Sequence, residues 1–143
     1  MARAWKSILR VVVGSFALVI FTAFVFTGNY SRVIMHRQGT AAIGVIRTIH
    51  TMQVQYHSQY GRHAASLREL GPAAGGLIDG ELASGTKGGY KFTLAGNASA
   101  YVIHVDPEEF GKSGSQSFYS DETMVIRQNY GRGPATVNSA ELK

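Results

Sequence analysis

The sequence predicts an α+β protein in which a single N-terminal transmembrane helix continues into a long amphipathic helix, which packs on a four-stranded antiparallel meander. Three observations predict this fold. Between Arg10 and Arg32 the chain carries no charge for 21 residues, and as a helix this run is roughly 31 Å long, close to one hydrocarbon thickness. Apolar residues then recur at helical spacing from Ala42 to Tyr60, and from Tyr90 onward the apolar period becomes two.

The uncharged run separates a basic N-terminal flank, residues 1–10, from a predicted transmembrane helix, residues 11–31. Its apolar region is longer than that of a signal peptide, and no Ala-x-Ala site follows it, which favours a retained anchor. Three Lys or Arg residues precede the span and two follow it closely. The positive-inside rule therefore predicts a cytoplasmic N-terminus and a C-terminal domain outside the cytoplasm.

The charge of the chain is distributed unevenly. Residues 1–68 hold eight Lys or Arg and no acid, whereas residues 69–143 hold nine acids and six bases. Because the basic excess brackets the predicted span, it favours membrane lipid or an acidic partner over nucleic acid. The chain has no cysteine, which excludes disulfides and thiolate metal sites.

The segment 32–61 is predicted to be an amphipathic stalk helix. One stripe of apolar side chains runs along it at a 4-3-3-4-4 spacing, and Gly61 is suited to end it. The stripe consists of Ala42, Ile46, Ile49, Met52, Tyr56 and Tyr60.

Residues 62–130 are predicted to form a head whose sheet packs on residues 40–61. Ser66 and Glu69 have the spacing of a capping box for a short helix, and the Gly-rich segment 73–89 is predicted to be a loop with one helical turn at 78–82. Gly96-Asn97 turns the chain between two alternating segments. The four expected strands are 90–94, 101–106, 117–120 and 124–128, and residues 131–143 are expected to be an extended C-terminal tail.

Several segments carry a resemblance to a known family. They are AIGVIRTIHTMQVQYHSQYG at 42–61, AASLRELG at 64–71, LID at 77–79, LASGTKGGY at 82–90 and SFYSDE at 117–122. In order and spacing this chain resembles type IV pilins and pseudopilins, and in particular pilin-like sequences of acidobacterial type, over roughly residues 40–130. The resemblance implies a pilin-like fold, a single-pass protein of the bacterial inner membrane and a periplasmic domain.

The N-terminus departs from the pattern of processed prepilins, which have a Glu as the fifth residue of the mature helix. Cleavage after Gly14 would place Val19 at this position. The leading hypothesis is therefore a non-enzymatic structural or interaction subunit of a multi-subunit envelope assembly, as a pilin-like or pseudopilin component. The alternative is an accessory single-span subunit of a larger membrane complex, of the respiratory or photosynthetic kind. A nucleic-acid-binding minor pilin and an enzyme are the remaining hypotheses.

No motif in the chain predicts catalysis, a cofactor or a metal, so we expect no catalytic, cofactor-binding or metal-ligating residue and no small-molecule substrate. Gly111-Lys112-Ser113 lacks the earlier glycine of a phosphate loop, and the acidic segment 106–109 lacks the ligand ladder of an EF-hand. His50 and His57 lie seven residues apart, about 10.5 Å along a helix, which is too far to share a metal ion. His63 can approach His57 only through the turn at Gly61, and the sequence assigns none of these histidines a role.

Overall fold

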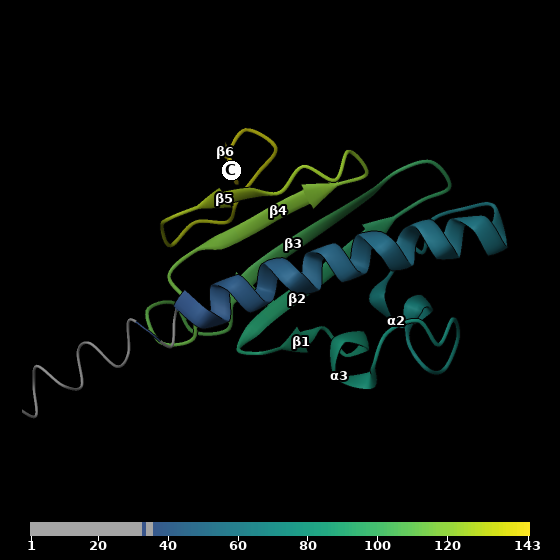
Figure 1. The fold of residues 1–143 in the computed structure, drawn as a ribbon, viewed down its shortest axis with the longest axis horizontal. Helices are drawn as coiled ribbons and strands as arrows, with labels where there is room; N and C mark the ends of the chain where they lie inside the picture. The colour runs from purple at the N-terminus through teal and green to yellow at the C-terminus, as the bar shows by residue number, and fades with distance from the viewer. Residues whose placement is uncertain (1–32, 34–35) are drawn as a thin grey trace, which may run out of the picture. The chain divides into compact units, whose positions relative to one another are not determined.

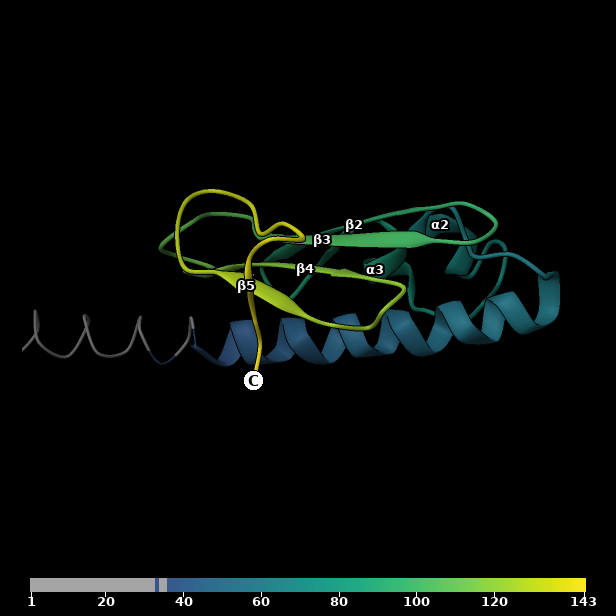
Figure 2. The same cartoon turned by 90° about the horizontal axis from the view of Figure 1, so that it is seen from above.

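The computed structural model describes Val33 and residues 36–143. The predicted basic flank, 1–10, and the predicted transmembrane helix, 11–31, lie outside these residues. Within the described residues, no helix combines the length and apolarity needed to cross a bilayer. The domain has two layers, because one long helix, residues 36–60, lies across one face of an antiparallel sheet (Figures 1 and 2).

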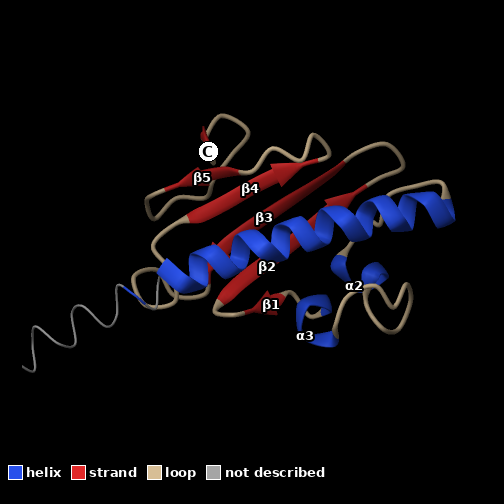
Figure 3. Cartoon of the chain, in the orientation of Figure 1, coloured by secondary structure: helices blue, strands red, loops and turns tan. Residues whose placement is uncertain are grey.

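The sheet has six strands in the order of the chain, each antiparallel to the next (Figure 3). The central pair β2 and β3 has seven residues in each strand, in register from Tyr90↔Pro107 to Gly96↔Tyr101. The strands are β1 Thr86–Lys87, β2 Tyr90–Gly96, β3 Tyr101–Pro107, β4 Ser117–Asp121, β5 Arg127–Asn129 and β6 Ala140–Glu141.

The prediction of a four-stranded, pilin-like meander is wrong, because a short strand is added at each edge. At one edge, β1 pairs with β2 through the two-residue loop Gly88-Gly89, where both glycines have positive φ, 58° and 78°. This geometry suits a tight hairpin, which glycine adopts without strain. The Gly-rich composition of 73–89 concealed this hairpin.

At the other edge, the segment expected to be an extended tail, 131–143, turns back on the sheet. β6 pairs with β5 in the register Arg127↔Glu141, and Ala135 is buried. The strand expected to start at Met124 starts only at Arg127, because Met124 has a positive φ of 63°. A residue in this conformation interrupts a strand, so residues 124–126 form a separate segment before β5.

The long helix and the sheet share one core. Four of the six stripe residues, Ala42, Ile46, Ile49 and Tyr56, are buried against the sheet, and Met52 is partly buried. Tyr60 is 54% exposed, so its assignment to the stripe is wrong. The helix stops where glycine allows it, since Gly61 has a φ of 69°. From the sheet, alternate residues of β2 and β3 complete the core, as period two requires: Tyr90, Phe92, Leu94, Tyr101, Ile103 and Val105.

Two short helices flank β1 and β2 in the connection after the long helix. Asp79 caps α3, Gly80–Ala83, because its Oδ1 accepts a hydrogen bond from the Leu82 amide, at 2.9 Å. At α2, Leu67–Leu70, the expected capping box is wrong, since the Ser66 side chain caps nothing. Glu69 instead accepts bonds from Arg62, Tyr56 and the Ala65 amide. This carboxylate ties α2 to the end of the long helix.

Candidate functional site

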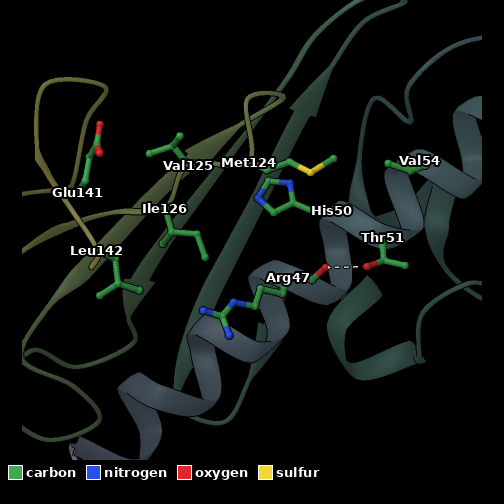
Figure 4. A pocket seen from close by; sticks show the side chains of 9 residues that line it. All are labelled: Arg47, His50, Thr51, Val54, Met124, Val125, Ile126, Glu141 and Leu142. Atoms are coloured by element: carbon green, nitrogen blue, oxygen red, sulfur yellow. Dashed lines mark hydrogen bonds between the residues drawn. The ribbon is translucent and has the colours of Figure 1, made fainter.

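A groove of about 690 Å³ runs between the long helix and the C-terminal part of the sheet (Figure 4). The helix supplies one wall, and the segment before β5 together with the end of the chain supplies the other. Its lining is Arg47, His50, Thr51, Val54, Met124, Val125, Ile126, Glu141 and Leu142. The groove is mostly apolar, with one charged side chain on each side.

The Met124 wall is shaped by a turn at the end of β4. The Asp121 carboxylate accepts bonds from the Thr123 amide and hydroxyl, and the Met124 amide bonds the Asp121 carbonyl at 2.9 Å. An Asx turn of this kind is a local property of Asp. It leaves Met124 in the left-handed region with half of its surface exposed. Val54 on the facing helix is 51% exposed, so the groove presents apolar side chains from both walls (Figure 4).

The C-terminal wall is held by β6. The Leu142 amide donates to the Ile126 carbonyl at 2.8 Å, and the Arg127 guanidinium bonds both the Ser139 carbonyl and the Glu141 carboxylate. Glu141 therefore lines the groove while paired with Arg127. On the helix wall, Thr51 Oγ1 donates to the Arg47 carbonyl at 3.1 Å (Figure 4). Hydrogen bonds to backbone carbonyls therefore support both walls.

His50 closes the floor of the groove and is almost fully buried. Its Nδ1 lies 2.7 Å from the Tyr101 hydroxyl and its Nε2 lies 2.8 Å from Ser120 Oγ. Ser120 Oγ in turn donates to the Val125 carbonyl at 2.9 Å. Since that bond uses the only hydroxyl proton, Ser120 accepts from His50, which places the imidazole proton on Nε2. Nδ1 is then the acceptor, and Tyr101 donates to it.

Burial shifts the pKa of both His50 and Tyr101. Burial lowers the pKa of His50, and the nearby Asp121 carboxylate opposes this only in part. Burial likewise raises the pKa of Tyr101 to about 12, with the carboxylates of Glu122 and Asp121 adding to it. Both groups are therefore neutral near pH 7. Both ring nitrogens of His50 are engaged in structure, which leaves none for a substrate or a metal.

His57 and His63 do come together across Gly61, with ring centroids 4.7 Å apart. His63 also packs on Tyr101 at 4.9 Å, and its Nδ1 is buried without a hydrogen-bond partner among the described residues. Burial lowers the pKa of His63, and the neighbouring His57 lowers it further. Over residues 36–143, no three His, Asp or Glu side chains are grouped as a metal site would need.

The other segments singled out in the sequence lie away from the groove. Asp106 lies near the end of β3, and Glu108 and Glu109 follow the strand. Asp106 shares a smaller pocket with residues 131–134. Ser113 forms a turn, because its amide and hydroxyl both bond the Glu109 carbonyl. This turn has no feature of a phosphate loop.

Sequence reasoning missed the partners of His50. Ser120 lies two residues after Phe118, and Tyr101 lies two before Ile103, so the period of two places both on the buried face. A polar residue on a buried face needs a partner, and this rule was the signal that could have linked them to His50. The turn at Asp121 that gives Met124 its positive φ was also missed.

Comparison of the chain with protein-family models, with curated proteins and with solved structures finds no match.

Proposed function

We propose that this protein is a non-enzymatic, membrane-anchored structural subunit that associates with further copies of itself in an envelope assembly. The uncharged run at 11–31 is the proposed anchor, and the domain of residues 36–143 is the proposed associating part, on the extracytoplasmic side. The observation that carries the proposal is the groove, where Val54 and Met124 expose apolar surface across from each other. Exposed apolar surface gathered in a groove is typical of a site for a protein partner.

A second copy is the occupant that the charges favour. On the long helix every charged side chain is basic, namely Arg37 and Arg47, and no acid occurs before Glu69. The acids lie in the later part of the chain, so the basic helix of one copy complements the acidic part of another. Opposite charges on different parts of one surface favour head-to-tail contacts between copies.

One acidic region, the segment 106–109, lies beside exposed apolar surface. This segment lies next to residues 131–134, and Tyr130 just before them is 73% exposed. Aromatic side chains with a polar tip are common anchors in protein interfaces. We therefore place Tyr130 of one copy in the groove of the next, with Glu108 near Arg47.

Cysteine cross-linking tests this arrangement directly, because the chain has no cysteine of its own. Full-length Val54→Cys and Tyr130→Cys are produced together in native membranes and oxidised. Disulfides form only between Cα atoms within about 7 Å, so we expect a dimer from this pair. Ala98→Cys, exposed at the tip of the β2–β3 hairpin, replaces Val54→Cys as the matched control and is expected to give none.

Other products would overturn parts of the proposal. A Val54 to Val54 dimer would replace the head-to-tail contact by a symmetric one. A product of different mass would identify a different subunit and favour the accessory role in a larger complex. A charge exchange supplies an independent check: Arg47→Glu and Glu108→Lys should each reduce the dimer yield, and together they should restore it.

The anchor is tested separately by extraction of membranes at alkaline pH. We expect the full-length chain to stay in the membrane fraction, and a chain lacking residues 1–31 to be released. Release of the full-length chain would overturn the proposed anchor and leave the groove untouched.

A further inference from the structure

The β2–β3 hairpin ends in an exposed turn, and its residues Asn97, Ala98 and Ser99 are all open to solvent. The turn lies at the end of the domain where the long helix stops (Figure 1), and beside it the Gly96 amide donates to the Ala65 carbonyl at 3.3 Å. The three residues read Asn-x-Ser, with x other than proline. In a surface loop, this triplet is the acceptor sequence for an N-linked oligosaccharide.

Hydrogen bonds engage the oxygen of the Asn97 side chain and leave its nitrogen free. Oδ1 accepts from the Ser99 amide and the Ala100 amide, each at 2.9 Å, and from the Ser99 hydroxyl at 3.3 Å. Within the described part of the chain, Nδ2 donates to no protein group. Three donors on the oxygen withdraw electron density from the amide and make its N–H more acidic. The side chain therefore offers an exposed, unbonded nitrogen beside a polarised carbonyl.

The turn itself does not need the Ser99 hydroxyl. The Asn97 amide closes the turn by donating to the Ala100 carbonyl at 2.9 Å, and the two backbone amides bound to Oδ1 complete it. An Asx turn of this kind explains asparagine at position 97, but at position 99 it requires only a backbone amide. The hydroxyl is the group that glycosyl transfer requires, and it contacts the amide that would react.

We propose that Asn97 is a glycosylation site, whose Nδ2 receives an oligosaccharide from a lipid-linked diphosphate donor on the extracytoplasmic side. The bond between Nδ2 and C1 of the first sugar forms while the bond between C1 and the diphosphate oxygen breaks. The electron pair of the broken bond stays on the lipid diphosphate, and the amide proton passes to a base of the transferase. No group is oxidised or reduced. The side of the membrane rests on the proposed function, whereas the acceptor chemistry rests on the hairpin tip alone.

An oligosaccharide at the tip is compatible with association through the groove. None of the nine residues that line the groove belongs to the segment 97–99. The attachment point therefore lies outside the contact proposed for Val54 and Tyr130.

The sequence contains a second triplet of the same kind, which serves as an internal comparison. Asn29-Tyr30-Ser31 lies outside the described residues and belongs to the predicted transmembrane helix, 11–31. Because the hydrocarbon region excludes a polar oligosaccharide, we expect no transfer to Asn29.

Transfer in vitro tests the acceptor. The full-length chain in detergent is incubated with a purified single-subunit oligosaccharyltransferase and its lipid-linked diphosphate oligosaccharide, and a free peptide that contains Asn-Ala-Ser is the positive control. We expect the intact mass of the chain to rise by one oligosaccharide, and peptide mapping to place it on Asn97. An unmodified chain beside a modified peptide would overturn the proposal, and so would transfer to Asn29 alone.

Matched variants separate the reacting atoms from the turn. Asn97→Asp keeps an oxygen for the two backbone amides but has no amide nitrogen, so transfer should be lost. Ser99→Thr keeps the hydroxyl and should keep transfer, whereas Ser99→Ala should lose it. All three variants should unfold at the same temperature as the unchanged chain, because the turn persists. Transfer that survives in Asn97→Asp or in Ser99→Ala would overturn the assignment.

The chain isolated from its native membranes tests the modification in the cell. We expect its intact mass to include one oligosaccharide, and Asn97→Asp to remove it. Ala98→Cys, treated in spheroplasts with a membrane-impermeant maleimide, reports the side of the membrane independently. Labelling of this cysteine in a chain without an oligosaccharide would overturn glycosylation of Asn97 and leave the proposed placement intact. A lack of labelling would overturn the extracytoplasmic placement in the proposed function, while transfer in vitro still decides the acceptor.

Discussion

Gln53 binds both backbone groups of Ala64. Its Nε2 donates to the Ala64 carbonyl at 3.0 Å and its Oε1 accepts from the Ala64 amide at 2.9 Å. Both residues have no exposed surface. The side-chain amide therefore replaces the neighbouring strand that these buried groups lack, and it fixes the path of the chain after the long helix.

Gln53→Ala is expected to lower the free energy of unfolding by about 2–4 kcal/mol, because it leaves a buried amide and a buried carbonyl of Ala64 without partners. Gln55→Ala, two residues away on the exposed face of the same helix, should change it by less than about 0.5 kcal/mol. Denaturant unfolding followed by circular dichroism measures both. Equal effects for the two variants would show that the bonds to Ala64 contribute nothing.

A pair of buried tyrosines gives opposite predictions. The Tyr90 hydroxyl is buried without a partner in the described residues, whereas the Tyr101 hydroxyl donates to His50. Removing an unpartnered hydroxyl relieves a desolvation cost, so Tyr90→Phe should leave stability unchanged or raise it by up to about 1 kcal/mol. Tyr101→Phe should lower it by about 1–2 kcal/mol. Thermal unfolding measures the stability of both variants. A larger loss of stability in Tyr90→Phe than in Tyr101→Phe would contradict this prediction and would indicate a hydrogen-bond partner for the Tyr90 hydroxyl.

The sequence predicted those features that depend on one short window. The stripe from Ala42 to Tyr56 and the alternation in β2 and β3 are local patterns of burial, and the structure has both. The edge strands β1 and β6 were missed because two residues are too few to show a period. The groove was missed for a different reason: one of its walls needs the return of the C-terminus to β5, and this pairing is long-range.

Glycine substitutions at two positions should act in opposite directions. A Cβ atom at Gly96 would lie 2.4 Å from the Ala64 carbonyl oxygen, a backbone atom that cannot move away alone. Gly96→Ala should therefore lower the free energy of unfolding by about 1–3 kcal/mol. Gly44 lies in the long helix with open space at its Cβ position, so Gly44→Ala should raise it by about 0.5–1 kcal/mol. Denaturant unfolding measures both variants. Changes in the free energy of unfolding that have the same sign at both positions would contradict the prediction.

The stacked pair of His57 and His63 predicts that the stability of the fold depends on pH. Burial lowers the pKa of His63 and the charge of His57 lowers it further. His57→Ser should therefore raise the pKa of His63 but leave it below 6.5, since burial is the larger cause. Because the folded pKa lies below the unfolded one, His63 stabilises the fold above pH 6.5 and less at lower pH. NMR titration of the His63 ring gives the pKa, and His104→Ser, on β3, is the control that should not change it.

Met124 links stability to association. Its φ of 63° is unfavourable for a side chain with a Cβ atom and suits glycine. Met124→Gly should therefore keep the free energy of unfolding or raise it by about 1 kcal/mol, while the dimer yield from Val54→Cys and Tyr130→Cys falls several-fold, since an apolar wall of the groove is lost. Val137→Gly, at a residue of similar exposure outside the groove lining, should leave the yield unchanged. A Met124→Gly variant that loses both stability and dimer yield would contradict this prediction. The loss of association would then follow from unfolding, and Met124 would contribute to the fold itself.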